Sequence, residues 1–569
     1  MISVRSVFRS AVAVSLGFLA SGAIGGVALA DGNDAAVASD SIVTYPASDY
    51  IEQAPGTPGG TLRISAASEP GTLDFQVSSS TPAKWLGRLI YDNLVYLDEK
   101  GNITPWLAKS WTISPDGKTY TFHLRDDVTF SDGTKFDAQA VLVNLRRMRD
   151  PATRASMTTA YIAPYVDGKV IDAYTFQANL REPYTPFLDV LAQSWLGMES
   201  PKEILENPKG LAETPIGTGP FTVESYTRSQ SIRFVKRPDY NWSPPFVHHP
   251  GPAYLDRIEV DIVSEAMVRY ASFVAGQYDF MLDAPPQNAA AIRADKSLVF
   301  SNRINLGNPF RGIAFNTTKP PFDNANLRKA VALSIDREGI AQLMGFGEYL
   351  PKTDYLSAIT PYYDPSFKDV LRYDVAGANR LLDAEGWTGR DADGYRTKNG
   401  QRLSAELLIR DVGTPSALIV EIQSDAKKVG VELKLLQLPS AQLLARRNAN
   451  DYQAMSDGIW HTNTPDGLYI VYHSKQISTA TFSGQNSSHL QDPQLDDLLS
   501  RARQSRDPAV LKDLYSQAQK RLTELVPTVP LYENHTLVAY KSFVKGVIAD
   551  TSHNTPFFTT VWLAPRGHS

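Results

Sequence analysis

The sequence predicts an α/β protein built from two lobes with a cleft between them. Apolar and polar residues alternate over 111–113 and again over 120–124, on either side of a Ser-Pro-Asp-Gly turn, which predicts a β-hairpin. Asp137, Asp336 and Asp374 each precede apolar residues at helical spacing, and aspartate in that position is a typical helix N-cap. Strands and helices are therefore expected to alternate along the chain.

A βαβ unit in the second half of the chain predicts a pair of parallel strands. Residues 403–409 have the composition of a strand, 417–429 have helical spacing, and 431–435 alternate as a strand. Strands joined in this way pair in parallel, because the crossover helix returns the chain to the same edge. The chain has 569 residues, of which 43% are hydrophobic, and this length exceeds what one hydrophobic core usually serves.

The first 30 residues have the pattern of a secretory signal peptide. Arg5 and Arg9 form a short positive region, 11–19 are almost wholly apolar, and the Ala-Leu-Ala at 28–30 offers small residues for cleavage. A retained membrane anchor is the alternative, because the stretch after Arg9 carries no charge up to the end of this segment. Residues 31–58 are polar and without period, which predicts an extended N-terminal arm.

Composition excludes several functional classes. The formal net charge is −5 and no basic run occurs, so the sequence indicates neither nucleic acid nor an anionic membrane as a partner. Cysteine is absent, so there is no thiol to lipidate, no disulfide and no thiolate nucleophile or metal ligand. An exported protein without a lipid anchor is expected to stay in a Gram-negative periplasm, freely soluble.

An ordered series of short motifs runs along the chain after the arm. The motifs are GGTL at 59–62, LD at 73–74, LIYDNLV at 89–95, PWLAKSW at 105–111, DGK at 116–118, YTF at 120–122, LR at 124–125, FSDG at 130–133, PIGTGPF at 215–221, RPDYNW at 237–242, FNT at 315–317, LRKAV at 327–331, the stretch 374–387, and VPLY at 529–532. This series resembles the dipeptide/oligopeptide/nickel group of ABC-transporter solute-binding proteins, solute-binding protein family 5.

The resemblance implies a two-lobed periplasmic-binding-protein fold of type II, with a hinge between the lobes and a small additional domain inserted in the first lobe. By the order of the motifs, lobe I would combine 59–88, 216–304 and 530–569, the inserted domain would be 89–215, and lobe II would be 305–529. It also implies a monomer that is not an enzyme, needs no cofactor, closes over a small solute and docks on the permease and ATPase subunits of an ABC importer.

The resemblance places the ligand-contacting segment at 457–466. In peptide-binding relatives a Trp here is followed, three residues later, by an Asp that pairs with the α-ammonium group of the peptide. Trp460 matches, but the residue three positions later is Asn463, which offers an acceptor and no charge. Oligosaccharides, opine-like conjugates and metal chelates therefore stay open beside peptides. Asp466 or Glu69 could supply the missing charge, because a buried ammonium needs a carboxylate partner.

Further candidates lie on both sides of the expected cleft. Ser79, Ser80 and Thr81 stand where relatives contribute polar groups from the first lobe, and a solvated turn before the next helix is the alternative. Trp460 is expected to form an aromatic wall of the pocket, with core packing as the alternative. His461 is the first candidate for a nickel ligand, with a hydrogen bond at the pocket rim as the alternative role.

No catalytic or metal motif is predicted. Asp391, Asp393 and Gly394 resemble the start of a calcium loop, but the remaining ligands are missing, so a tight turn is expected. The glycine-rich stretch 217–221 lacks the Lys-Ser/Thr ending of a phosphate loop and is expected to be a packing turn. None of the nine histidines has H-E-x-x-H spacing, and no G-x-S-x-G elbow occurs.

The predicted function is the periplasmic substrate-binding component of an ABC importer, with a peptide as the first choice of solute. Two alternatives come from other classes. One is a secreted hydrolase whose catalytic residues have no recognisable spacing. The other is a periplasmic holdase that binds unfolded clients in a peptide cleft.

Overall fold

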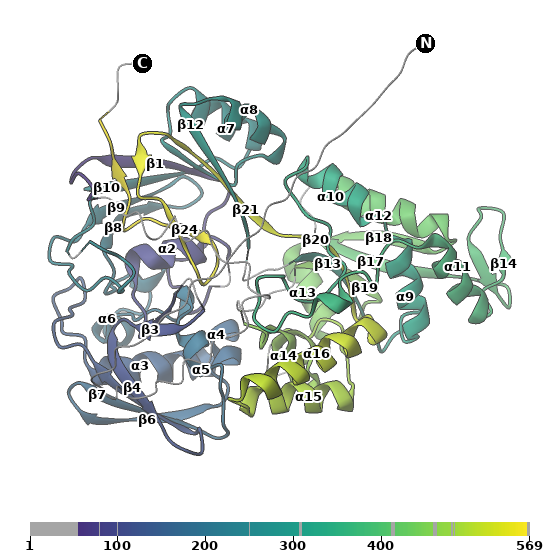
Figure 1. Cartoon of the computed structure of the whole chain (residues 1–569), viewed down its shortest axis with the longest axis horizontal. Coiled ribbons are helices and arrows are strands. Elements are labelled where there is room, and N and C mark those ends of the chain that lie inside the picture. Colours follow the sequence, from purple (N-terminus) through teal and green to yellow (C-terminus); the bar gives the residue numbers. More distant parts are fainter. Residues whose placement is uncertain are drawn as a thin grey trace, which may run out of the picture. The chain divides into compact units, whose positions relative to one another are not determined.

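Two large β-sheets organise the chain (Figure 1). The computed structural model describes residues 55–565 without 79, 99–100, 250, 306–309, 411–415, 459–463, 480–481 and 483. These described residues belong to one compact unit. Among them, no helix is both long enough and apolar enough to cross a bilayer.

The first sheet has seven strands and is mixed. In spatial order they are β12 (Leu298–Ile304), β21 (His535–Lys541), β11 (Phe280–Leu282), β1 (Thr61–Ala66), β10 (Arg257–Ile262), β9 (Ser231–Lys236) and β8 (Phe221–Thr227). β1 pairs in parallel with both of its neighbours, and the other pairs are antiparallel. β1 therefore lies in the interior of the sheet, with three strands on either side.

The second sheet has five strands. In spatial order they are β18 (Glu432–Leu438), β17 (Ser404–Arg410), β19 (Ala454–Gly458), β13 (Phe310–Phe315) and β20 (Thr528–Glu533). β17 and β18 pair in parallel across helix α12 (Ala417–Lys428), which confirms the predicted βαβ unit. β13 pairs antiparallel with β19 on one side and with β20 on the other.

A four-stranded antiparallel sheet carries the predicted hairpin. Its order is β4 (Ala108–Ile113), β5 (Thr119–Leu124), β7 (Thr175–Leu180) and β6 (Tyr165–Asp172). Trp111 lies opposite Phe122, and the turn closes with a 2.8 Å hydrogen bond from the Gly117 N–H to the Ser114 carbonyl. Gly117 has a φ of +70°, a value that glycine adopts without steric cost. The hairpin prediction is therefore confirmed.

Shorter strands form small ribbons at the edges. They are β2 (Val95–Leu97) with β3 (Ile103–Pro105), β14 (Gly389–Arg390) with β15 (Arg396–Lys398) and β16 (Gln401–Arg402), β22 (Val544–Lys545) with β25 (Trp562–Leu563), and β23 (Ile548–Asp550) with β24 (Thr555–Phe557). The turn before β15 holds Asp391 and Asp393, whose carboxylates both pair with Arg402. This confirms a tight turn at the position that resembled a calcium loop.

Three helices begin at the predicted aspartate caps. Asp137 accepts the Ala140 N–H at 2.9 Å, Asp336 accepts the Gly339 N–H at 3.0 Å, and Asp374 accepts the Gly377 N–H at 2.7 Å. The helices are α2 (Ala83–Ile90), α3 (Ala138–Arg149), α4 (Ser156–Tyr161), α5 (Phe187–Leu191), α6 (Pro201–Glu206), α7 (Ala266–Val274), α8 (Ala289–Ala294), α9 (Ala325–Ser334), α10 (Arg337–Gly345), α11 (Val375–Ala384), α12, α13 (Ser440–Asn448), α14 (Gly467–Tyr472), α15 (Pro493–Gln504) and α16 (Pro508–Leu525).

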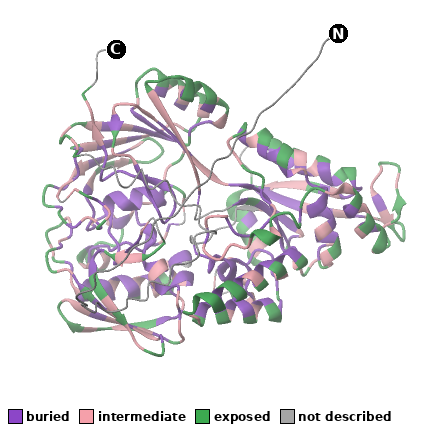
Figure 2. Ribbon diagram, in the orientation of Figure 1, coloured by how far each residue is buried: buried purple, intermediate pink, exposed green. Residues whose placement is uncertain are grey.

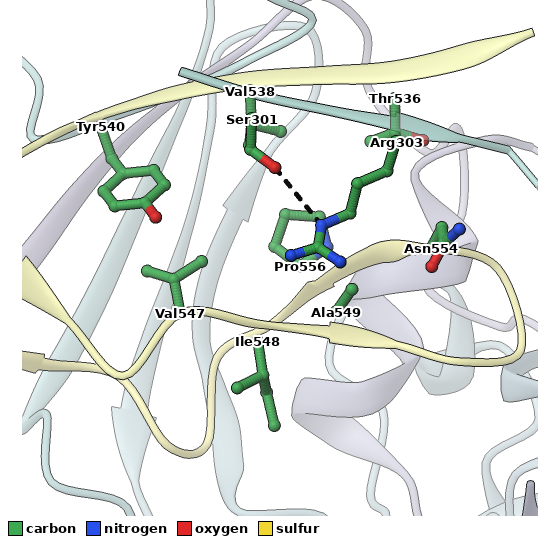
Figure 3. Close-up of a pocket in the computed structure, with 10 residues that line it drawn as sticks. All are labelled: Ser301, Arg303, Thr536, Val538, Tyr540, Val547, Ile548, Ala549, Asn554 and Pro556. Carbon is green, nitrogen blue, oxygen red and sulfur yellow. Dashed lines mark hydrogen bonds between the residues drawn. The ribbon is translucent and has the colours of Figure 1, made fainter. Parts of the chain in front are cut away.

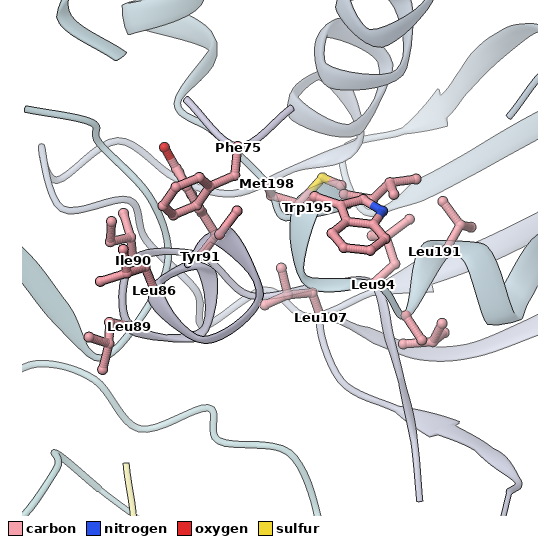
Figure 4. Close-up of a cluster of buried hydrophobic side chains, with 14 of the residues drawn as sticks. Phe75, Leu86, Leu89, Ile90, Tyr91, Leu94, Leu107, Leu191, Trp195 and Met198 are labelled. Carbon is pink, nitrogen blue, oxygen red and sulfur yellow. The ribbon is translucent and has the colours of Figure 1, made fainter. Parts of the chain in front are cut away.

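The two large sheets have separate hydrophobic cores. One core joins the first sheet, α2 and the four-stranded sheet, and Figure 4 shows its part around Tyr91 and Trp195. The other core joins the second sheet to α9, α12, α15 and α16. Figure 2 shows buried residues concentrated on the faces of the elements that point toward these cores, whereas the opposite face of α15 is exposed. Two cores let each sheet with its helices pack independently, which is the physical basis of a two-lobed fold.

The glycine-rich stretch 217–221 packs against the end of α2, as predicted. The Gly219 N–H donates to the Ile90 carbonyl at 2.8 Å. A Cβ at Gly217 would lie 2.1 Å from the Ile90 oxygen, and one at Gly219 would lie 2.4 Å from the Ile90 carbonyl carbon. Only glycine permits this close approach of two backbones.

Candidate functional site

The chain passes between the two large sheets at two neighbouring places. It leaves the first sheet after β12 and enters the second at β13, and it returns from β20 to β21. The two crossings are joined where the Asn305 N–H donates to the Asn534 carbonyl at 2.8 Å. Paired crossing segments of this kind form a hinge, because rotation of one sheet against the other is absorbed by a few backbone dihedrals.

A cavity of about 300 Å³ lies beside these crossings. Both sheets contribute to it, at the end of β1 and after β11 on one side, and from β13 and β20 on the other. The lining residues are Ala66, Ala67, Ser68, Thr81, Pro82, Trp85, Leu282, Asp283, Asn305, Arg311, Tyr349, Tyr532, Asn534, His535, Thr536, Thr555 and Pro556. Aromatic walls with a few polar groups in a volume of this order are typical of small-molecule sites.

Stacked tyrosines form one wall. The rings of Tyr349 and Tyr532 lie 5.3 Å apart and are parallel within 1°. Burial and the adjacent Tyr532 raise the pKa of Tyr349 to about 12, so this phenol is neutral at physiological pH. His535 lies 5.6 Å from the Tyr349 ring, and burial lowers its pKa to about 4. The wall is therefore polarisable and uncharged.

A lysine lies buried under the hinge. Lys84 on α2 is 1% exposed, and its Nζ donates to the Asn305 side-chain oxygen at 3.1 Å. Burial, with the positive charge of Arg311 as a second cause, lowers the pKa of Lys84 to about 7. This contact ties the first crossing segment to the helix that covers the first sheet.

A second, smaller cavity of about 60 Å³ lies between β12, β21 and the segment that carries β23 and β24 (Figure 3). It shares Thr536 and Pro556 with the larger pocket. Figure 3 shows the Arg303 side chain crossing this space, with its Nε donating to the Ser301 hydroxyl at 3.3 Å. The volume suits water and is far below that of a solute site.

Four of the sequence-predicted site residues lie outside the described residues: Ser79, Trp460, His461 and Asn463. Thr81 lines the pocket. Ser80 does not line it. Its N–H donates to the Ser78 hydroxyl and its carbonyl accepts the Ala83 N–H, so it belongs to the turn at the start of α2.

The two predicted substitute carboxylates are engaged within the protein. Glu69 accepts hydrogen bonds from the Ser229 N–H at 2.7 Å and the Tyr226 hydroxyl at 2.9 Å, and the Ser229 bond is the main cause that lowers its pKa. Asp466 is 1% exposed and forms a bidentate ion pair with Arg503 at 2.6 and 2.9 Å. Neither residue lines the pocket.

Sequence reasoning missed most of the residues that line the pocket. Asp283 follows β11, Arg311 lies in β13 and Tyr349 follows α10, and none of them stands in a recognisable binding motif. Tyr532 belongs to the VPLY motif, which indicated the family but did not predict that this residue lines a pocket. A charged residue inside the apolar run of β13 was the one local signal available. Among the described residues, no group of three or more His, Asp and Glu side chains could hold a metal ion.

Comparisons with known proteins agree with this architecture. Residues 102–479 match the family described as bacterial extracellular solute-binding proteins, family 5. The glutathione-binding protein GsiB of Shigella dysenteriae is 26% identical over 497 residues, which covers 86% of this chain and 92% of that protein.

Two solved structures share the fold. The periplasmic binding protein DppA of Helicobacter pylori, in complex with the peptide STSA, is 25% identical with a TM-score of 0.75, covering 89% of this chain and 98% of DppA. The binding protein AgaA of A. tumefaciens R10, in complex with agropinic acid, is 26% identical with a TM-score of 0.73, covering 88% and 96% of the two chains.

The fold and the pocket at the hinge thus define a two-lobed, type II solute-binding protein, which binds its ligand and is not an enzyme. The chain belongs to family 5 of the bacterial extracellular solute-binding proteins. As predicted, it is the component of an ABC importer that captures a small solute and delivers it to the membrane permease and ATPase subunits. The secreted hydrolase is set aside by this membership.

Proposed function

We propose that this protein captures a peptide or peptide-like solute in the periplasm, between its two lobes, for import. The observation that carries the proposal is the pocket of about 300 Å³ at the hinge, which takes residues from both large sheets. A ligand that touches both sheets stabilises the closed arrangement, and the closed form is the one that a permease can distinguish from the open form.

The named ligands of the relatives favour this class of solute. GsiB is named for glutathione, DppA holds the peptide STSA, and AgaA holds agropinic acid. Glutathione and STSA are peptides. A pocket with stacked tyrosines, hydroxyls and two opposite charges suits such amide-rich solutes, because aromatic faces pack against the backbone while polar groups fix its orientation.

The predicted segment at Trp460, His461 and Asn463 belongs to this proposal as a further wall of the site. It follows directly on β19, whose last residue, Gly458, lies opposite Arg311 in the second sheet. Arg311 lines the pocket. The described part of the chain before this segment thus ends opposite a residue that lines the pocket, which supports the proposal. Trp460→Ala is expected to weaken solute binding without unfolding the protein.

The lobe boundaries and the exported form complete the proposal. We assign lobe I to 59–88, 216–304 and 530–569, the inserted domain to 89–215, and lobe II to 305–529. The last boundary falls within β20, the strand from which the chain returns to the first sheet. Residues 1–30 act as a cleaved signal peptide, and the absence of cysteine leaves the mature protein without a lipid anchor.

Thermal unfolding of the purified, ligand-free protein against pools of solutes tests this function. The pools are di- to pentapeptides, glutathione, opines, oligosaccharides and nickel chelates. A ligand at 100 times its Kd stabilises the native state by about 2.7 kcal/mol, which shifts the unfolding midpoint by several degrees. A shift with peptides or glutathione is expected. If the unfolding midpoint shifted with oligosaccharides alone, or if none of the pools shifted it, the proposed solute class would be overturned.

A further inference from the structure

Two opposite charges lie in the pocket on different sheets. Of the described residues that line it, Asp283 is the single carboxylate and Arg311 the single Arg or Lys side chain. We propose that Asp283 and Arg311 determine the specificity of the site by binding, respectively, the ammonium and the carboxylate of one zwitterionic solute. This inference rests on the proposed function and adds to it the charges of the solute and the two residues that select them.

Arg311 is held with its guanidinium available to a ligand. Its strand β13 is fixed on both sides, by Gly458 of β19 and Tyr532 of β20, and the register shifts between Arg311 and Gly312. Such a bulge changes the direction of a side chain and is common beside functional sites. Arg311 is exposed, and within the described part of the chain no carboxylate lies within ion-pair distance of it. A cation in a cavity without a protein partner favours an anionic group of the ligand.

Asp283 is held in a conformation that few residues adopt. Its φ is +51°, and this left-handed backbone is stabilised from two sides. The Asp283 side chain accepts the Ala67 N–H at 3.2 Å, and its carbonyl accepts the Arg269 guanidinium at 2.7 Å. Positive φ at a residue other than glycine costs free energy and is concentrated at functional sites. Within the described part of the chain the other carboxylate oxygen makes no hydrogen bond, and Asp283 is exposed and lines the pocket.

Asp283 and Arg311 both act electrostatically on Tyr349, one of the two stacked tyrosines of the pocket wall. Besides burial, the carboxylate of Asp283 raises the pKa of Tyr349 and the guanidinium of Arg311 lowers it, so Tyr349 lies within reach of both fields. Tyr349 stacks on Tyr532, which neighbours Arg311 in the sheet. A short solute lying along this wall can place one charged end near each residue.

Asp283 can supply the carboxylate that the peptide-binding relatives have at the position of Asn463. The two carboxylates expected to compensate for Asn463 are engaged, Asp466 by Arg503 and Glu69 by Ser229 and Tyr226. Asp283 lines the pocket from the opposite sheet. A zwitterion held by Asp283 on the first sheet and Arg311 on the second bridges the two lobes, so each charge contributes to closure as well as to affinity.

Blocked peptides test the assignment. Binding to the full-length protein is measured by calorimetry with trialanine and glutathione, and with their N-acetylated, C-amidated and doubly blocked forms; maltotriose is the neutral probe. For the wild type, N-acetylation and, for trialanine, C-amidation are each expected to weaken binding at least about tenfold, because each leaves one protein charge unpaired in the pocket.

Charge-neutral variants assign each end. Asp283→Asn keeps a residue type that tolerates positive φ, and it is expected to bind free and N-acetylated trialanine alike. Arg311→Gln is expected to bind free and amidated trialanine alike. The matched controls are Asp393→Asn and Arg501→Gln, which change exposed ion pairs away from the pocket and should keep the wild-type preferences. The unfolding midpoint of each ligand-free variant verifies that it folds.

The outcomes separate this inference from the proposed function. Equal binding of free and doubly blocked peptides to the wild type overturns the inference and leaves the proposed function intact. So does a wild-type preference that persists in Asp283→Asn and Arg311→Gln. Binding of maltotriose alone, or of none of the probes, overturns the proposed peptide function and the inference with it.

Discussion

The N–H of Asn305 donates a 2.8 Å hydrogen bond to the carbonyl oxygen of Asn534, at the point where both connections between the two large sheets pass side by side. The pocket takes both asparagines into its lining. The hinge and the proposed binding site therefore lie at the same place in the chain, so a ligand in the pocket would contact the segments that bend when the lobes move.

Removing the Asn305 side chain is expected to destabilise the protein by about 1–3 kcal/mol, because two largely buried hydrogen bonds are lost. In Asn305→Ala the backbone bond to Asn534 remains, but Lys84 and the Thr536 hydroxyl lose the contacts of 3.1 and 3.4 Å that the side chain provides. Urea unfolding measures the change. Asn448→Ala at an exposed position is the control, and an equal, small effect of both substitutions would contradict the role of Asn305.

Titration of Lys84 is expected to make the free energy of unfolding depend on pH in the alkaline range. Its pKa is about 7 in the folded protein and 10.5 when unperturbed, so the unfolded chain binds more protons between these values. Stability contributed by this group therefore rises as pH increases from 7 to 10.5 and is constant below 7. Lys84→Met is expected to flatten this slope in urea unfolding at several pH values, whereas the exposed Lys109→Met keeps it. An unchanged slope in Lys84→Met would refute the assignment.

Titration of His535 is expected to make the free energy of unfolding depend on pH in the acidic range. Burial lowers its pKa from 6.5 to about 4, so protonation favours the unfolded chain. Stability is unaffected above pH 6.5 and is lost as pH falls toward 4. His535→Gln is expected to reduce this loss in part, because buried His473 and His553 titrate in the same sense. His123→Gln on an exposed face is the control, and equal acid sensitivity of both variants would count against His535.

Truncation of the buried Asp466–Arg503 ion pair is expected to be strongly destabilising. Arg503 lies between the rings of Tyr184 and Tyr469, at 4.6 and 3.6 Å, and is bidentate with Asp466. Arg503→Met leaves the Asp466 carboxylate buried without its partner, which costs about 3–5 kcal/mol.

Arg501 provides the matched control for that variant. It lies on the same helix and pairs with Asp497 in solvent, where both side chains are more than half exposed. Arg501→Met is expected to change the free energy of unfolding by about 0.5 kcal/mol or less. Denaturant unfolding compares the two variants, and losses of similar size would show that the buried pair has no special role.

The hairpin over 108–124, the aspartate caps and the βαβ unit were predictable because each depends on residues close in the sequence. Alternation, turn chemistry and helix capping are local interactions, and Asp137, Asp336 and Asp374 form the capping bonds that their positions predict. The series of motifs then identified the family, which implied two lobes and a hinge.

The sequence by itself therefore determined the class of fold, the family and the transport role of this protein. Only the tertiary structure decided which charges are available to a ligand. Asp466 and Asp283 are both acidic in the sequence, but Arg503, 37 residues after Asp466, neutralises the first, while the end of β11 brings the second into the pocket. Arg311, Tyr349 and Tyr532 likewise meet Ala67 and Asp283 only after the two sheets are assembled. Pairing and burial depend on contacts between distant segments, and no local pattern encodes those contacts.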